Sequence, residues 1–463
     1  MSQQKNPTLM EKIESLSKRR GFIFQSSEIY GGFGSNYDYG PLGVELANNI
    51  KKAWWQSMVQ ERFDVEGIDS AIIMHPKIWQ ASGHIESFTD PLVDCKKCKR
   101  RFRADHLLES ASIKPDPEGK REPPKDIKDI VCPECGGDLT DPRNFNLLMK
   151  TSIGAVENET ADAYLRGETC QGIYVNFKNV IDSTHQKIPF GIAQIGKAFR
   201  NEITPGNYIF RTREFEQMEM QYFVNPKDAN NHFKYWKEAR MKWYQDLGIR
   251  KDFLRWRQHG KDEMAHYAQE AWDIEFNSPF GGWKELAGVH NRGDWDLTRH
   301  QEFSGADLTC LDPKTKERFH PYIIETSDGV GRAMLAFLIN AYDEIDARSG
   351  DDKSKHKKEI VLRLHKRLAP IKIAVLPLSK KEKLQKLAKD IGRKLSLSYM
   401  TRYDETGSIG KRYRRQDEIG TPYCVTVDFD SLEDRKVTVR DRDTMRQERI
   451  EIVRVENYFK EKF

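Results

Sequence analysis

Four cysteines stand in two closely spaced pairs, Cys95 with Cys98 and Cys132 with Cys135. Two C-x-x-C pairs separated by a polar stretch let two tight turns present four thiolates tetrahedrally to one zinc ion. A redox dithiol or chance spacing is the alternative for a single pair, but two pairs in a segment poor in apolar residues favour zinc. Because cysteine fills all four positions, the sequence predicts a structural Zn²⁺ with no open coordination site.

A second group combines arginine, glutamate and phenylalanine on two neighbouring segments. Arg200 and Glu202 lie two positions apart, and Arg211 and Phe215 follow after a loop. Taken alone, an arginine and a glutamate two apart on a strand are more often a surface ion pair than a functional pair. Arginine is nevertheless the side chain best suited to grip phosphate, since it stays charged and binds in a bidentate manner.

The order of these segments along the chain adds the decisive pattern. Phe-Arg-x-Glu from Phe199, followed by Arg-x-x-x-Phe from Arg211, resembles motif 2 of the class II aminoacyl-tRNA synthetases, and Gly-Val-Gly-Arg at 329–332 resembles motif 3. The helix expected after Pro41 resembles motif 1, which in that class builds a dimer interface. Within the class the chain resembles the homodimeric glycyl-tRNA synthetase family. The segments that carry this closer resemblance are 37–43, 103–105, 166–173, 214–219 and 325–329.

Two positions depart from the family pattern, Gly167 where proline is expected and Cys170 where alanine is usual. The resemblance otherwise extends over nearly the whole chain. It implies ATP-dependent activation of glycine to glycyl-adenylate and transfer of glycine to the 3′ end of tRNA(Gly), with Mg²⁺ accompanying ATP. The partners it implies are ATP, glycine, tRNA(Gly) and a second copy of the chain in a homodimer.

The first step is an in-line attack of the glycine carboxylate on the α-phosphate of ATP. Since the nucleophile is already ionised, the enzyme must mainly position the reactants and neutralise charge. The resemblance assigns Arg200 to the α-phosphate, and Arg211 and Arg332 to the distal phosphates. Phe215 would stack on adenine, with an ordinary core phenylalanine as the alternative, and Glu202 would accept from the adenine amine. Glu285 would help to hold Mg²⁺.

The resemblance implies the following sets of site residues. The catalytic set is Arg200, Glu202 and Arg332. The ATP-binding set is Arg200, Asn201, Glu202, Phe210, Arg211, Thr212, Arg213, Glu214, Phe215, Glu285, Leu286, Gly329, Val330, Gly331 and Arg332. The glycine-binding set is Arg103, Glu168, Phe215, Glu216, Gln217, Met218, Glu219, Glu325, Thr326, Ser327, Asp328 and Gly329.

A glycine pocket must hold an ammonium and a carboxylate while leaving no volume for a β-carbon. Several carboxylates around one small cation repel each other, so the pocket needs a compensating positive charge or a raised pKa. Arg103 is the charge partner that the resemblance offers. A pocket excludes a larger amino acid by lack of space more easily than it rejects a smaller one. No editing site is therefore expected.

The resemblance implies an α+β fold with a class II catalytic core built on an antiparallel sheet. The expected organisation is a catalytic core with motif 1 (1–94), a zinc-binding insertion (95–142), the core with motifs 2 and 3 (143–350), a linker (351–369) and an α/β anticodon-binding domain (370–463). At 463 residues the chain exceeds what one hydrophobic core usually serves, which agrees with two or three domains.

Periodicity predicts several individual elements. Val44, Ala47, Ile50, Trp54 and Met58 recur at helical steps and form one apolar stripe. The segments 194–199 and 215–223 are expected to be adjacent antiparallel strands, and 230–247 and 331–342 to be helices. Loop composition is found at 114–128 and at 348–358. Strand and helix patterns then alternate from 371 to 429, as in a separate small α/β domain.

Composition sets the class of protein and its surroundings. The net charge of +5 comes from 76 basic and 71 acidic side chains, which permits nucleic acid binding without demanding it. No signal peptide and no run of about 18 apolar residues is present, so we expect a cytoplasmic protein without a membrane segment. Lys411, Arg412, Arg414 and Arg415 around Tyr413 form a basic cluster able to meet RNA phosphates and stack a base, with a solvated charge run as an equal alternative.

Three alternatives to the glycyl enzyme stay open at this point. Another class II synthetase, such as a threonyl or prolyl enzyme, would share the nucleotide residues but not the glutamate-rich pocket. A non-catalytic, nucleic-acid-binding relative of the synthetases need not keep Arg200, Glu202, Arg211 and Arg332 together. A metal-binding RNA module would explain the cysteine pairs and the basic clusters. It would not explain the segments that resemble motifs 2 and 3.

Overall fold

The computed structural model describes residues 7–113, 126–153, 162–202, 206–260, 264, 268–346 and 358–463. Most of the loop expected at 114–128 and of the linker expected at 348–358 lies outside these residues. The α-helices are α1 (Leu9–Arg20), α2 (Pro41–Trp55), α3 (Pro76–Ala81), α4 (His84–Ser87), α5 (Ala104–Ile113), α6 (Cys170–Thr184), α7 (Ala229–Asp246), α8 (Trp295–Ser304), α9 (Val330–Ala341), α10 (Glu382–Ser396), α11 (Ile409–Glu418) and α12 (Val455–Lys460).

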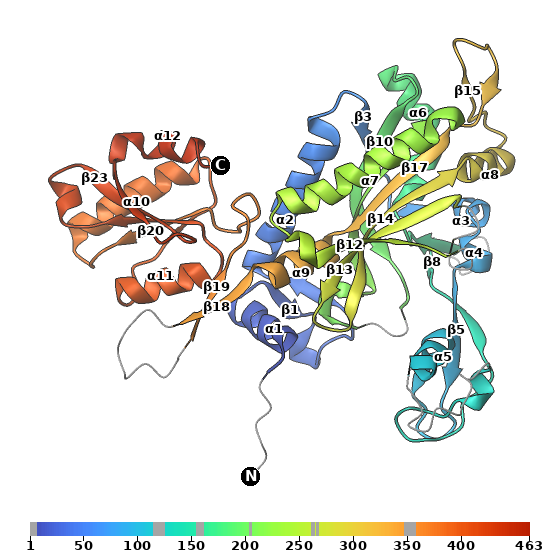
Figure 1. The fold of residues 1–463 in the computed structure, drawn as a ribbon, viewed down its shortest axis with the longest axis horizontal. Helices are drawn as coiled ribbons and strands as arrows, with labels where there is room; N and C mark the ends of the chain where they lie inside the picture. Colours follow the sequence, from blue (N-terminus) through green and yellow to red (C-terminus); the bar gives the residue numbers. More distant parts are fainter. Residues whose placement is uncertain are drawn as a thin grey trace.

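A seven-stranded sheet forms the centre of the molecule (Figure 1). Its strand order is β12 (Leu254–Gln258), β13 (Glu270–Ser278), β14 (Gly282–Gly293), β17 (Tyr322–Gly329), β11 (Glu214–Val224), β10 (Phe190–Phe199) and β3 (Val65–Gly67). All neighbours are antiparallel except β3, which runs parallel to β10. The antiparallel strands expected at 194–199 and 215–223 are therefore confirmed as parts of β10 and β11.

The two faces of this sheet carry different side chains, because successive residues of a strand point to opposite sides. On β11, Met218 and Met220 face the largest core cluster, which also holds Ile324 of β17. The alternate residues Gln217 and Glu219 face a cavity. The same strands therefore form both the wall of the core and the floor of the cavity.

Helices α2, α7 and α9 supply the side chains that fill the core on one side of the sheet. Pro41 begins α2 at a position where its missing N–H has no helical partner, and α7 and α9 confirm the helices expected at 230–247 and 331–342. Of the predicted stripe on α2, Ala47, Ile50 and Trp54 are buried, but Val44 is 41% exposed, so its assignment to the stripe was wrong. Val44 lies on the outer face of α2, since Leu42, Gly43 and Leu46 in the same part of the helix are buried.

The opposite side of the sheet is covered in part by α6 and α8, whose apolar residues pack with Phe190, Phe223 and Ile323 of the strands. Smaller strand pairs and sheets surround this centre: β1 (Ile23–Gln25) with β2 (Tyr37–Tyr39), β4 (Ile73–Met74) with β9 (Asp162–Leu165) and β8 (Met149–Ser152), β15 (Cys310–Leu311) with β16 (Arg318–Phe319), and β18 (Tyr342–Asp346) with β19 (Lys358–Leu362).

The segment with the cysteine pairs projects from the sheet as a separate arm (Figure 1). It contains β5 (Thr89–Asp94), β6 (Arg101–Arg103), β7 (Arg143–Asn146) and α5. Contrary to the sequence-based view that it lacks a core, Val93, Ala104 and Ile127 form a small buried cluster there.

The C-terminal part has its own five-stranded sheet in the order β21 (Thr401–Tyr403), β20 (Ile373–Pro377), β22 (Tyr423–Val427), β23 (Lys436–Asp441) and β24 (Gln447–Glu451). β20 is parallel to both β21 and β22, as a strand and helix alternation predicts. Its apolar side chains pack with α10 and α12 in a second core cluster. Within the described residues, no helix has both the length and the apolar character needed to cross a membrane.

Candidate active site

A cavity of about 290 Å³ opens on the face of the central sheet opposite the main core. Its walls come from β11, β14, β17, the start of α9 and the loop that follows β10. The residues that line it are Glu168, Arg200, Glu202, Ile209, Phe210, Arg211, Thr212, Phe215, Glu216, Gln217, Glu219, Glu285, Leu286, Gly288, His290, Arg292, Glu325, Ser327, Gly329, Gly331 and Arg332.

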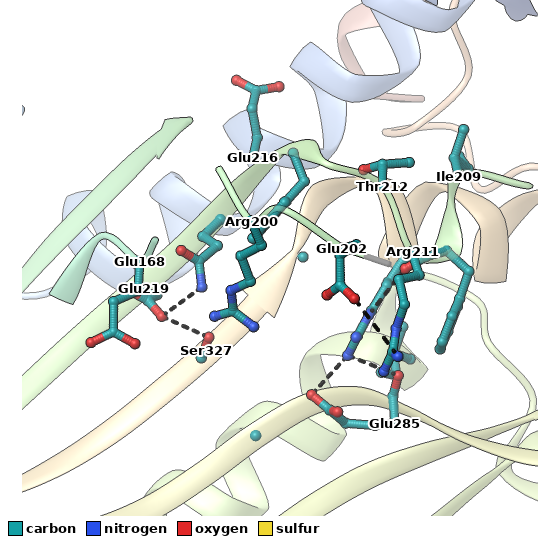
Figure 2. A pocket seen from close by; sticks show the side chains of 18 of the residues that line it. Glu168, Arg200, Glu202, Ile209, Arg211, Thr212, Glu216, Glu219, Glu285 and Ser327 are labelled. Atoms are coloured by element: carbon teal, nitrogen blue, oxygen red, sulfur yellow. Dashed lines mark hydrogen bonds and ion pairs between the residues drawn. The ribbon is translucent and has the colours of Figure 1, made fainter. Parts of the chain in front are cut away.

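Three arginines occupy one half of this cavity. Arg332 Nη1 lies 2.7 Å from Glu285 Oε1, and Arg211 Nη1 lies 3.9 Å from Glu202 Oε2. Figure 2 shows Arg200 between Arg211 on one side and the acidic residues Glu168 and Glu219 on the other. The Arg200 Nε donates to the carbonyl of Gly167 at 3.0 Å, which leaves its terminal nitrogens directed into the cavity.

Two phenylalanines line the same half. The Arg200 guanidinium lies 5.3 Å from the centre of the Phe215 ring, and the Arg332 guanidinium lies 4.7 Å from that of Phe210. Phe215 is half-buried and lines the cavity, so it is not a fully buried core residue. Each ring thus pairs with an arginine that also faces the cavity.

Glu219 lies at the acidic end. Its Oε1 accepts hydrogen bonds from Gln217 Nε2 at 3.0 Å and Ser327 Oγ at 2.9 Å, and Thr169 donates to Oε2. Burial, together with Glu325 and Glu168, raises the pKa of Glu219 to about 7. This carboxyl group therefore changes its charge near neutral pH.

The two neighbouring carboxylates behave in the opposite way. Burial alone would raise the pKa of Glu325, but Arg292 and His290 lower it to about 2. Burial likewise opposes ionisation of Glu168, yet His84 and Arg292 hold its pKa well below the usual value. The acidic end therefore contains two carboxylates that are fixed as anions beside one that titrates.

The positive charge that compensates these anions is not the predicted one. Arg292 Nη1 lies 2.9 Å from Glu325 Oε2, and His290 Nδ1 lies 2.9 Å from Glu325 Oε1. Arg103 does not line the cavity. Its guanidinium lies 2.9 Å from Asp90 and 2.6 Å from Asp105 on the cysteine-containing arm.

Seven other predicted residues also lie outside the lining, and strand periodicity explains three of them. Met218, Thr326 and Asp328 alternate with the lining residues and point to the core side of the sheet. Val330 is buried in α9. The remaining three are Asn201, Arg213 and Glu214.

Asp328 lies on the core side of the sheet, where its partners differ from those of the cavity residues. Its side chain is fully buried and accepts hydrogen bonds from Arg240 at 3.0 Å, Tyr244 at 2.7 Å and Trp54 at 3.1 Å. All three donors belong to helices under the sheet. Asp328 therefore belongs to the core beneath the cavity and is not one of the residues that line it.

The two departures from the family pattern have local consequences. Gly167 supplies the carbonyl that orients Arg200. Cys170 begins α6, and its thiol donates to Glu168 at 3.0 Å, a contact that alanine could not make. The carbonyl at position 167 belongs to the main chain and proline would supply it equally, so only the change at Cys170 adds a side-chain contact.

The four cysteines of the arm converge as expected. All four sulfur atoms lie within 4.8 Å of one another, with Cys95 to Cys135 at 3.5 Å and Cys98 to Cys132 at 3.7 Å. Tetrahedral zinc with Zn–S bonds of about 2.3 Å separates its sulfurs by roughly 3.8 Å. The donor set and its spacing therefore fit one Zn²⁺.

Part of the basic cluster at 411–415 is buried in the C-terminal domain. Arg412 is 2% exposed and donates to the Leu378 carbonyl at 3.2 Å. The Tyr413 hydroxyl is 2.6 Å from Thr426 Oγ1, so its ring packs against the sheet. Arg414 and Arg415 pair with acidic residues. Lys411 is exposed, and RNA contact by the outward-facing residues of this helix stays a prediction.

Comparison with known proteins identifies the family. A model of the tRNA synthetase class II core domain (G, H, P, S and T) matches residues 154–341, and a model of the anticodon binding domain matches residues 372–462. The chain is 56% identical to a glycine–tRNA ligase of Treponema denticola, over 95% of this chain and 94% of the relative. It is 53% identical to that of Thermobifida fusca, over 98% of each.

The chain belongs to the glycine–tRNA ligase family. Its fold is also similar to solved structures from the same class. A prolyl-tRNA synthetase of Giardia lamblia in complex with prolyl-adenylate matches with a TM-score of 0.65 and 16% identity, covering 96% of this chain and 76% of that one. At this identity the likeness shows the class II fold alone.

Within this family fold, sequence reasoning missed four lining residues, namely Ile209, Gly288, His290 and Arg292. The last three share one face of β14, since they lie two positions apart. A glycine, a histidine and an arginine with this period, alternating with the apolar Ala287 and Val289, were the available signal. It was overlooked because none of the quoted family segments includes β14.

Proposed function

We propose that this protein activates glycine with ATP to glycyl-adenylate and transfers the glycyl group to the 3′ end of tRNA(Gly). The observation that carries the proposal is the composition of one cavity. Arg200, Arg211 and Arg332 line one half, and a cluster of carboxylates with Ser327 lines the other. Phosphates suit the first half and an ammonium group the second. The high identity to glycine–tRNA ligases over nearly the full chain supports the choice of amino acid.

At the acidic end, Glu325 and Glu168 offer permanent negative charge to the substrate ammonium, and Glu219 completes the group when it is ionised. Gln217 and Ser327 fill the space around Glu219 by hydrogen bonding to it. Larger amino acids are excluded because these side chains leave no space for a β-carbon. Specificity therefore requires no separate editing site.

At the other end, Arg200 holds the α-phosphate, and Arg211 and Arg332 hold the distal phosphates of ATP. Glu202 Oε2 is a buried oxygen for which the described residues provide no hydrogen-bond donor, as expected of an acceptor for the adenine amine. Glu285, which is half exposed beside Arg332, would hold Mg²⁺. When bound, that ion supplies charge neutralisation between the phosphates. Gly329 and Gly331 bring the positive end of α9 to the same cavity.

Activation then needs no general base from the protein. The carboxylate of glycine is ionised, and the side chains act by holding it in line with the α-phosphate and by stabilising charge as pyrophosphate leaves. Arg200 lies between the two halves of the cavity, so it is the residue suited to contact the reacting phosphate (Figure 2).

The remaining partners follow from other parts of the molecule. Cys95, Cys98, Cys132 and Cys135 would bind a structural Zn²⁺ that stabilises the arm. The domain at 372–462 would contact the anticodon of tRNA(Gly). A homodimer is supported by the exposed apolar side chains of Ile29, Tyr30 and Phe33 in the β1–β2 hairpin next to motif 1, at 87%, 86% and 61% exposure.

Exchange of ³²P between pyrophosphate and ATP, measured with each of the twenty amino acids in turn, tests the proposal. We expect exchange with glycine alone, and its loss in Glu219→Ala. The matched control is Glu302→Ala, which removes an exposed carboxylate of α8 that pairs with Arg299. Exchange that depends on threonine or proline, or normal glycine-dependent exchange by Glu219→Ala, would refute the assignment.

A further inference from the structure

A line of four polar side chains crosses one half of the central sheet and ends in the cavity. His259 follows β12, Asp273 belongs to β13, His290 to β14 and Glu325 to β17. His259 Nε2 lies 2.6 Å from Asp273 Oδ2, Asp273 Oδ1 lies 3.7 Å from His290 Nε2, and His290 Nδ1 lies 2.9 Å from Glu325 Oε1. The contacts therefore connect the edge of the sheet to the acidic end of the cavity.

Strand register explains why these groups meet. His290 is the direct cross-strand partner of Glu325. Asp273 is opposite Gly288, which in turn is opposite Ser327. A β-carbon at Gly288 would lie 3.0 Å from two atoms of the His290 ring and 3.7 Å from Asp273 Oδ1. Glycine at this position therefore leaves the space in which the imidazole and the carboxylate approach each other.

The His290 ring has anions on both sides. Burial lowers the pKa of the ring, but Asp273 and Glu325 raise it to about 9. The His290 ring in turn helps to lower the pKa values of Asp273 and Glu325, against the effect of burial. The other charged and titratable groups that face this line are Arg292, Glu168 and Glu219 at the cavity end and Arg257 of β12, whose Nη1 lies 4.0 Å from Asp273 Oδ2. The imidazolium thus adds positive charge, beside that of Arg292, to a cluster of acids.

These side chains form hydrogen bonds and ion pairs rather than a metal site. His259, Asp273 and His290 offer three ligand atoms within 4.8 Å of one another. Two ligand atoms on tetrahedral zinc lie roughly 3.3 Å apart when each bond is about 2.0 Å. The 2.6 Å contact between His259 and Asp273 is shorter than this and has the length of a charge-assisted hydrogen bond.

We propose that His290 is a positioning residue for the amino acid substrate, which holds the Glu325 carboxylate in place for the substrate ammonium while Asp273 and His259 orient the imidazole ring. This inference rests on the proposed function. Glu325 Oε2 is fixed by Arg292 at 2.9 Å and Gln221 at 3.1 Å, so His290 is the neighbour that fixes Oε1. Without His290, Glu325 Oε1 loses its hydrogen-bond partner, and the carboxylate can rotate away from the cavity.

The test compares His290→Ala and His290→Asn in glycine-dependent pyrophosphate exchange. Loss of a hydrogen bond between charged groups should raise KM for glycine about 10- to 100-fold in His290→Ala, with little change in KM for ATP. The asparagine amide nitrogen can occupy the position of Nδ1, so His290→Asn should recover most of that loss. His320→Ala, which removes a histidine bonded to Gln301 outside the cavity, is the matched control.

A pH profile separates positioning from a merely structural role. The wild-type ring loses its charge as pH rises through about 9, whereas asparagine carries no charge at any pH. Glycine loses its own ammonium proton at alkaline pH in both proteins, so this effect cancels in the ratio of their kcat/KM values. We expect the ratio of wild type to His290→Asn to be constant below pH 8 and to fall above pH 9.

The outcomes are distinguishable. If the wild type shows no glycine-dependent exchange, the proposed function fails and this inference with it. If the wild type exchanges glycine but His290→Ala keeps its KM and the pH ratio stays flat, only the inference fails. Should His290→Ala not fold, Asp273→Asn takes its place, because it removes the anion behind the ring while retaining the cavity lining. An unchanged KM for glycine in that variant overturns the proposal equally.

Discussion

Replacement of Asp328 by alanine should destabilise the protein without altering its affinity for glycine. The side chain is fully buried beside Arg240, which is 1% exposed, and the two are joined by hydrogen bonds of 3.0 Å. Removing one partner of a buried ion pair costs about 3–5 kcal/mol because the remaining charge is left uncompensated. Tyr244 and Trp54 also lose their acceptor, at about 1 kcal/mol each.

The expected loss is thus about 5–7 kcal/mol, a large part of the stability of an ordinary domain. For a catalytic core of this size it corresponds to a decrease of Tm by about 10–20 °C. Thermal unfolding followed by circular dichroism measures the decrease, and pyrophosphate exchange well below the new Tm measures KM for glycine. Asp246→Ala is the matched control, since that aspartate is exposed on α7 and pairs with Lys242.

A double variant sharpens the test. Arg240→Met in the Asp328→Ala background removes the unpaired guanidinium, and it should restore part of the lost stability. The reasoning is refuted if Asp328→Ala melts within about 3 °C of the wild type while KM for glycine rises more than about tenfold. That result would show that Asp328 serves the cavity after all.

Two further predictions follow from the site and the arm. The pKa of Glu219 is raised from its ordinary value to about 7, so protonation grows as pH falls through 7 and removes negative charge from the ammonium site. KM for glycine should therefore rise between pH 8 and pH 6 in the wild type and stay nearly level, at a higher value, in Glu219→Gln; a flat wild-type profile contradicts this. Purified protein should contain one zinc per chain, and Cys132→Ser or a chelator should make the arm sensitive to trypsin while the Tm of the central sheet is kept. Metal content well below one per chain would argue against the thiolate site.

The sequence predicted the cysteine cluster and the arginine half of the cavity well, because both depend on short local patterns. Cys95 and Cys132 each begin a C-x-x-C turn, and Arg200 and Arg211 flank a single hairpin. Family resemblance then supplied the residues at the start of α9. These features needed little knowledge of how distant segments pair.

Features that depend on sheet register were missed. The segments 216–219 and 325–329 were taken as continuous runs, although from Gln217 to Met220 and from Glu325 to Asp328 only alternate residues face the cavity. His290 and Arg292 escaped notice because their function arises from pairing β14 with β17. Register between strands far apart in the chain is set by tertiary packing, which a single sequence does not display.

The burial of Arg412 in the basic cluster was missed for a related reason. Arg412 and Gln416 lie one helical turn apart and face the C-terminal sheet, where both are buried. Charge in the sequence predicts exposure only when a side chain lacks an internal partner. Arg412 has partners in the backbone carbonyls at the end of β20.

The interleaving of cavity and core residues on β11 and β17 constrains how the amino acid specificity of this enzyme could be redesigned. A library that randomises Gln217, Glu219, Glu325 and Ser327 would vary the chemistry of the pocket while the support beneath it stays intact. A library over a continuous window would also vary Met218, Thr326 and Asp328, so most of its members would be lost to misfolding before any substrate was tried. Between Gln217 and Met220, and between Glu325 and Asp328, changes of specificity are therefore accessible at every second position only.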